Sequence, residues 1–176
     1  IGGSWHNQWG LDTLNVDYTD DMNAPFKLYE KELAGSALPV DIVSTDWIIP
    51  VGDSSQDFVI SSHTLEHAAN PLKALFEWYR VTKPGGIIYI HLPEREESEY
   101  DHGRPLTTYD ELMDWYTNNR QVGTSDAEVS HHYTVWKVEN CQDVFSRFPD
   151  KFKLEHVGFP DDKVGNSVVV ILRVVK

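Results

Sequence analysis

The stretch DFVISSHTLEHAANPLKALFEWYRVTKPGGIIYIHLP, residues 57–93, decides the fold. It begins with a short apolar run at residues 58–60, which is typical of a buried strand. Asn70-Pro71 then marks a helix start, because proline at the first helical position presets φ and loses no hydrogen bond. The helix has one apolar face, since apolar side chains recur three or four positions apart. They are Leu72, Leu75, Phe76 and Tyr79.

A glycine stop and a second strand follow the helix. Gly85 and Gly86 end it, because glycine adopts the positive φ that closes a helix without steric cost. Residues 87–92 form an almost uninterrupted apolar strand that contains His91. Two apolar strands joined by a helix of this length make a βαβ unit, in which the strands are parallel and the crossover is right-handed. The stretch therefore predicts half of a doubly wound α/β sheet.

The same periodicity and turn signals predict further elements on either side. The predicted strands lie at residues 14–17, 39–43, 152–159 and 167–175, and the predicted helices at residues 26–33, 109–116 and 138–148. A T-x-x-E capping box, Thr108 to Glu111, begins the second of these helices. The last two strands are joined by a short turn-rich segment, which requires them to be antiparallel neighbours.

Composition and charge bound the class of protein. The length suits one domain, residues 1–176, and 40% hydrophobic with 24% charged residues is ordinary for a soluble globular chain. The net charge of −13 argues against nucleic-acid and anionic membrane partners, because phosphate binding relies on lysine and arginine. The single cysteine, Cys141, excludes an internal disulfide. No apolar run approaches the ~18 residues of a membrane span. We therefore expect a cytoplasmic protein without nucleic-acid or membrane partners.

The central stretch resembles a known family. The run D-F-V-I-S-S-H-T-L-E-H…N-P…A-L-x-E-W-x-R-V-x-K-P-G-G is similar to the fourth strand, the following helix and the fifth strand of class I S-adenosylmethionine-dependent methyltransferases, of the type 11 kind. The resemblance implies a Rossmann-like, mostly parallel sheet with a C-terminal antiparallel hairpin, and S-adenosylmethionine as cofactor. It also implies that residues are missing upstream of Ile1, because the family's first strand is not present in the sequence.

The resemblance assigns cofactor contacts near the start of the chain. Gly2 and Gly3 match the end of the family's glycine-rich loop, where a Cβ would block the approach of the backbone to the cofactor. An ordinary turn is the alternative for this pair. Asp17, followed by Tyr18, ends the family's second strand, where a carboxylate binds the ribose hydroxyls.

Two later segments complete the implied cofactor site. Asp46 and Trp47 stand where the family has an acid that accepts a hydrogen bond from the adenine amino group and a bulky neighbour that packs on the ring. A capped loop with a tryptophan in the core is the alternative. Ser61, Ser62 and His63 follow the family's fourth strand, so the resemblance places them beside the methyl donor.

Methyl transfer requires mainly positioning, with a base where the acceptor is a hydroxyl. Histidine suits this role because its ordinary pKa is ~6.5. We predict His131, His132 and His67 as catalytic residues, with residues 93–136 as an insertion that covers a small-molecule acceptor such as a sugar or secondary metabolite. A structural corner packed against Trp136 is the alternative for the histidine pair.

The pentapeptide HTLEH, residues 63–67, also matches the H-x-x-E-H motif of zinc hydrolases. That motif needs both histidines on one face of a long helix, with the glutamate as base. Here a predicted strand ends just before the motif and a predicted helix starts just after it, although Glu94 or His131 would offer a third ligand. We therefore predict a methyltransferase without a metal. The alternatives are a zinc hydrolase that uses this motif and a methyltransferase-like binding protein without catalysis.

Overall fold

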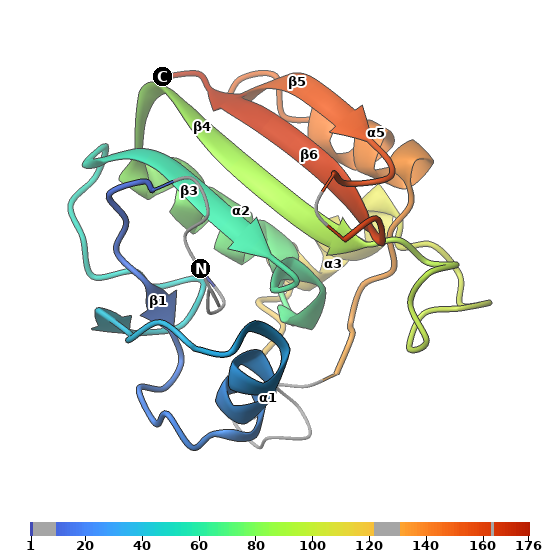
Figure 1. Ribbon diagram of the computed structural model, residues 1–176. Helices are drawn as coiled ribbons and strands as arrows, with labels where there is room; N and C mark the ends of the chain where they lie inside the picture. The colour runs from blue at the N-terminus through green and yellow to red at the C-terminus, as the bar shows by residue number, and fades with distance from the viewer. Residues whose placement is uncertain (2–9, 122–130, 163) are drawn as a thin grey trace.

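The computed structural model describes residues 1, 10–121, 131–162 and 164–176. Its main sheet has four strands in the order β3-β4-β6-β5 (Figure 1). The strands are β3 (Gln56–Ser62), β4 (Thr82–Pro93), β5 (Phe152–Gly158) and β6 (Ser167–Val174). β3 and β4 are parallel, whereas β6 is antiparallel to both β4 and β5. The predicted βαβ unit and the antiparallel C-terminal hairpin are confirmed.

A second, smaller sheet holds the first part of the chain. It pairs β1 (Val16–Asp17) with β2 (Ile42–Val43) in parallel, and α1 (Pro25–Ala34) connects them. In Figure 1 this unit lies below the edge strand β3. No described residue forms a strand between β1 and β3, so the described strands make two sheets where the sequence predicted one. A cavity of about 180 Å³ lies between them, lined by residues of both β1 and β3.

Three helices lie on one side of the main sheet (Figure 1). They are α2 (Pro71–Val81), α3 (Tyr109–Thr117) and α5 (Val138–Ser146). The Asn70 side chain caps α2 by accepting a hydrogen bond from the Lys73 amide, and the predicted capping box of α3 is present. α2 packs on β4, α5 packs on β5, and α3 packs on α2. Ile88, Ile90 and Leu92 of β4 are fully buried in the core that results.

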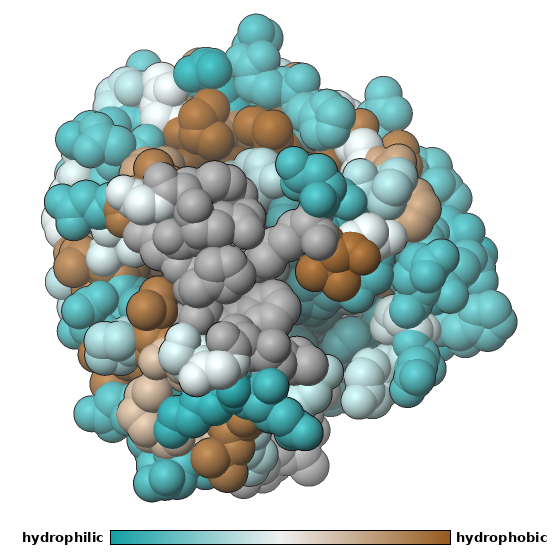
Figure 2. Space-filling model, viewed as in Figure 1, coloured by the Kyte–Doolittle hydropathy of each residue, from teal (hydrophilic) through white to brown (hydrophobic). Residues whose placement is uncertain are grey.

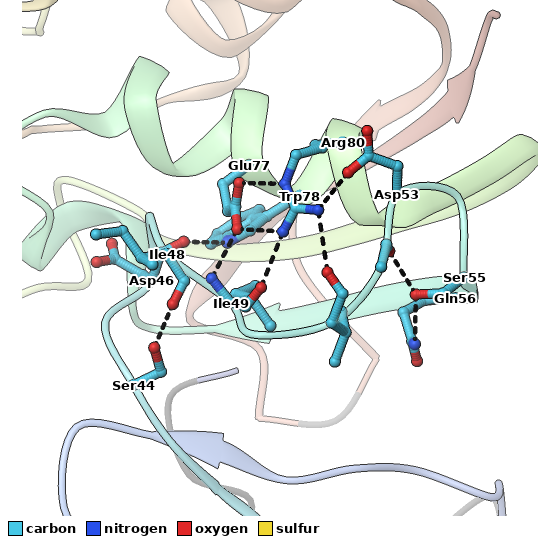
Figure 3. Close-up of polar contacts among 12 residues, drawn as sticks. Ser44, Asp46, Ile48, Ile49, Asp53, Ser55, Gln56, Glu77, Trp78 and Arg80 are labelled. Atoms are coloured by element: carbon cyan, nitrogen blue, oxygen red, sulfur yellow. Dashed lines mark hydrogen bonds and ion pairs between the residues drawn. The ribbon is translucent and has the colours of Figure 1, made fainter.

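An arginine on α2 fastens the loop after β2 to the helix (Figure 3). Arg80 donates to both carboxylate oxygens of Glu77, to Asp53, and to the carbonyls of Ile49 and Val51. Glu77 in turn accepts from the Ile49 amide at 2.6 Å. This network fixes the segment that carries the predicted adenine contacts.

The surface is mostly hydrophilic on the face drawn in Figure 2, with separate hydrophobic patches. None of the described helices has the length and apolar character needed to cross a membrane.

Candidate functional site

The predicted cofactor residues follow the carboxyl ends of the parallel strands. Asp17 is the last residue of β1, and its register partner in β2 is Val43, three residues before Asp46. Ser61 and Ser62 end β3. Open α/β sheets bind ligands at this edge, because the chain turns away there and leaves backbone and side-chain groups exposed to a crevice. Gly2 and Gly3 lie outside the described residues.

Asp17 is buried and paired. Its Oδ2 lies 3.1 Å from Lys27 Nζ, and its Oδ1 accepts a hydrogen bond from the Tyr18 amide at 2.7 Å. Lys27 comes from α1 and is itself fully buried. The Tyr18 ring packs on Phe26 with a centroid distance of 5.2 Å. The Asp17 carboxylate is therefore held in one orientation by its ion pair with α1. A ribose bound to this carboxylate would contact it beside Lys27.

Asp46 offers a second carboxylate at the same edge. The Asp46 carbonyl accepts from the buried Trp78 Nε1 at 3.0 Å, which anchors the backbone and leaves the side chain to point elsewhere (Figure 3). Burial raises the pKa of Asp46 to about 6. The Trp47 ring lies beside α2, where Lys73 Nζ is 5.6 Å from its centroid.

The end of β3 presents polar groups with different surroundings. Ser61 is buried, and its Oγ has no hydrogen-bond partner among the described residues. His63 has a φ of 50°, which turns the chain sharply after the strand. Its Nε2 lies 2.8 Å from Ser167 Oγ, at the start of β6. A buried hydroxyl without a partner is costly unless a ligand satisfies it.

A cluster of side chains lies directly after this turn. Glu66 and His67 belong to the single 3-10 turn η1 (Leu65–His67). The Glu66 carbonyl accepts from the Tyr133 amide at 2.7 Å, which brings the segment after residue 130 against η1. As a result the rings of His67 and His132 meet edge to face, with centroids 4.6 Å apart.

Asp101 orients His132 from the far side. His132 Nδ1 lies 2.7 Å from Asp101 Oδ2, and since a carboxylate only accepts, this nitrogen carries the hydrogen. Arg104 donates to Asp101 at 2.6 Å and to the His132 carbonyl at 2.9 Å. Although burial favours the protonated form, the hydrogen bond from His132 and nearby charges lower the pKa of Asp101.

Burial controls the charge of Glu66 and His67, the two residues of the cluster that come from η1. It raises the pKa of Glu66 to about 8 and lowers the pKa of His67 to about 4. Both side chains therefore favour their neutral forms near pH 7. His67 Nδ1 lies 3.2 Å from the His131 carbonyl, so this nitrogen is the donor and Nε2 faces Glu66.

The structure brings His67 and His132 together, as two of the three predicted catalytic histidines. The His131 side chain is exposed and contacts the Tyr133 ring instead. The H-x-x-E-H pentapeptide lies in a turn and η1, so the long helix that a hydrolase motif requires is absent at these residues. Sequence reasoning missed Asp101 and Arg104. Asp101 ends the charged run at residues 94–101, and Arg104 lies three residues later; such a run is typical of a solvated loop.

Comparison with known proteins identifies the family. The family model of the methyltransferase domain matches residues 3–90, half of the chain. The chain belongs to this family. Its methyl donor is therefore S-adenosylmethionine, as the sequence predicted. A search of curated proteins found no match.

Solved structures share the fold of this methyltransferase. A Pyrococcus horikoshii protein is 16% identical with a TM-score of 0.53, and the match covers 94% of this chain and 73% of that one. A SAM-dependent methyltransferase from Aquifex aeolicus is 19% identical with a TM-score of 0.51, over 91% and 67%. A chain of the Haloferax volcanii complex that contains the Trm112 methyltransferase activator is 16% identical with a TM-score of 0.53, over 92% and 71%. The predicted Rossmann-like α/β fold is confirmed.

Proposed function

We propose that this methyltransferase acts on a small-molecule acceptor that carries a hydroxyl group, such as a sugar or a secondary metabolite. The observation that carries the proposal is the buried pair of His132 and Asp101, placed beside His67 at the carboxyl end of β3. A histidine that is oriented by a carboxylate is suited to remove a hydroxyl proton. The net charge of −13 favours a small acceptor over a phosphate backbone.

The described residues fit the cofactor. Asp17 and Tyr18 would bind the ribose, and Asp46 and Trp47 would bind the adenine. The end of the molecule that carries the methyl group would lie against Ser61, Ser62 and His63. Gly2 and Gly3, which lie outside the described residues, would contribute backbone contacts. The orphaned Ser61 Oγ supports this placement, because a ligand atom would supply its missing partner. When bound, S-adenosylmethionine supplies an activated methyl group on a sulfonium.

The segment 93–136 would cover the acceptor. It supplies Asp101, Arg104 and His132, and its two ends meet directly after β4, where Glu94 pairs with Trp136 in an isolated parallel bridge. Because Arg104 contacts both Asp101 and the His132 carbonyl, the loop and the histidine are held as one unit. An acceptor bound against this unit is shielded from water on that side.

The test is transfer of a radiolabelled methyl group from S-adenosylmethionine by the full-length protein to pooled sugars and phenols, with RNA and protein pools in parallel. We expect labelling of a hydroxyl-bearing small molecule. His132→Ala should lower kcat at least tenfold, whereas His102→Ala, an exposed histidine paired with Glu96, should not. Labelling of RNA or protein alone, or an unchanged kcat in His132→Ala, would contradict the proposal.

A further inference from the structure

We propose that Glu66, His67 and His132 bind a divalent transition-metal ion such as Zn²⁺. One ligand atom from each of these residues lies within 4.8 Å of the other two. Two imidazole nitrogens and one carboxylate are a ligand set that suits zinc and neighbouring first-row metals. The residues come from η1 and from the segment after residue 130, which the Glu66 carbonyl and Tyr133 amide hold together at 2.7 Å.

The buried carboxyl group of Glu66, which has no hydrogen-bond partner in the described part of the chain, indicates that a ligand binds here. Its side chain is 0% exposed, and neither carboxylate oxygen has a hydrogen-bond partner among the described residues. The nearest imidazole nitrogens, His63 Nδ1 and His67 Nε2, are each 3.7 Å from Oε1, too far for a hydrogen bond. A buried polar group in this state is unfavourable, and a bound cation would satisfy it.

Each histidine is oriented as metal-binding histidines are. His67 donates through Nδ1 to the His131 carbonyl, and His132 donates through Nδ1 to Asp101. A metal-ligating histidine almost always donates its other nitrogen to a carbonyl or carboxylate in this way, which fixes the tautomer. Nε2 is therefore the ligand nitrogen on both rings.

The cluster is close to a coordination geometry. Ligand atoms at about 2.1 Å from a tetrahedral ion are roughly 3.4 Å apart, so His67 Nε2 and Glu66 Oε1 need to approach by only a few tenths of an ångström. The His132 nitrogen, which lies within 4.8 Å of the other two ligand atoms, would need to approach by up to about 1.4 Å. Three protein ligands leave one position open, as in catalytic zinc sites. Water would occupy that position, and, if the proposed function holds, the acceptor hydroxyl would replace it and become more acidic there. Because both nitrogens of His132 would then be engaged, the metal-bound form would rely on this acidification in place of His132 as the base.

This ligand set differs from that of the H-x-x-E-H hydrolase motif. In that motif both histidines bind the metal and the glutamate is the base. Here His63 Nε2 contacts Ser167 Oγ, and the second imidazole comes from His132. The metal would therefore sit between η1 and the covering segment, where it would join the two.

The experiment is titration of Zn²⁺ and Co²⁺ into the metal-free full-length protein, followed by calorimetry and by the visible absorption of bound Co²⁺. We expect one ion per chain with a dissociation constant of about 1 μM or below and a tetrahedral cobalt spectrum. Glu66→Gln and His132→Ala should weaken binding at least 100-fold. His102→Ala is the matched control, because this side chain is 71% exposed and lies outside the cluster, and it should bind as the wild type does.

A second readout guards against variants that do not fold. Zn²⁺ at a concentration that just saturates the wild type should raise the melting temperature of the wild type and of His102→Ala, but not that of a folded Glu66→Gln. The metal site is contradicted if the wild type binds no ion, or if Glu66→Gln binds as tightly as the wild type. If methyl transfer persists in metal-free protein, the ion does not activate the acceptor hydroxyl, whereas the proposed function is unaffected.

Discussion

Arg80→Lys tests whether one arginine holds the loop after β2 in place. Arg80 makes five hydrogen bonds, of which three go to Glu77 and Asp53 and two to the carbonyls of Ile49 and Val51. Lysine keeps the positive charge but lacks the planar fork that reaches several acceptors at once. We expect it to retain one carboxylate contact and to lose both bonds to the loop carbonyls.

The expected magnitude follows from those two bonds. A typical intramolecular hydrogen bond contributes about 1 kcal/mol net to stability. The Arg80 side chain is 33% exposed, so water replaces part of what is lost. We therefore expect Arg80→Lys to lower the free energy of unfolding by about 1–2 kcal/mol and the melting temperature by about 3–6 °C. Because the loop carries Asp46, affinity for S-adenosylhomocysteine should also fall.

Urea denaturation followed by circular dichroism measures the change in stability. Arg147→Lys is the matched control, since Arg147, the C-cap residue of α5, also pairs with an acid one turn earlier, Asp143. The Arg147 side chain is 48% exposed and donates to no loop carbonyl among the described residues. We expect no measurable change in that variant. Equal effects of the two substitutions would refute the reasoning, because the loop contacts would then contribute nothing.

Three further predictions concern other parts of the chain. Burial raises the pKa of Asp46 to about 6, so its carboxylate is deprotonated as the pH rises from 5 to 7.5. If it accepts from the adenine amino group, calorimetric affinity for S-adenosylhomocysteine should rise over that range, and the profile should flatten in Asp46→Asn. Thr108→Ala removes the cap of α3 and should cost about 1 kcal/mol in urea denaturation, whereas Thr117→Ala at the other end of the helix should not. Burial raises the pKa of the Cys141 thiol well above its ordinary value, so a thiol reagent should label it only as the protein unfolds; labelling of the native state at the rate of a free thiol would contradict the burial.

Local signals in the sequence were sufficient to predict most of the elements. The proline start at Pro71 and the capping box before α3 act within a few residues, and both helices begin where these signals place them. The hairpin of β5 and β6 follows from its short connection. Whether β1 and β3 belong to one sheet depends on contacts between residues that are distant in sequence. Consequently the separation into two sheets could not be predicted.

The sequence predicted site residues only where a recognisable motif lies at the end of a predicted strand, as at residues 61–67. Ser61 and His67 were identified because Ser61 lies at the end of a recognisable strand and His67 lies shortly after it. Asp101 was missed because a charged run is usually solvated, and nothing local shows that its carboxylate is buried against His132. The Glu66 carbonyl accepts from the Tyr133 amide, which lies far along the chain. Residues that only the tertiary structure brings together show no recognisable spacing in the sequence.

Calorimetric titration of S-adenosylhomocysteine into the full-length protein tests the central claim most directly. The account predicts one site per chain with a dissociation constant of about 1–100 μM. Asp17→Asn should weaken that binding, because its amide keeps the shape of the side chain but cannot hold the ribose hydroxyls beside Lys27 in the same way. No binding at millimolar ligand to folded wild-type protein would contradict the assignment of this edge of the sheet as a methyl-donor site.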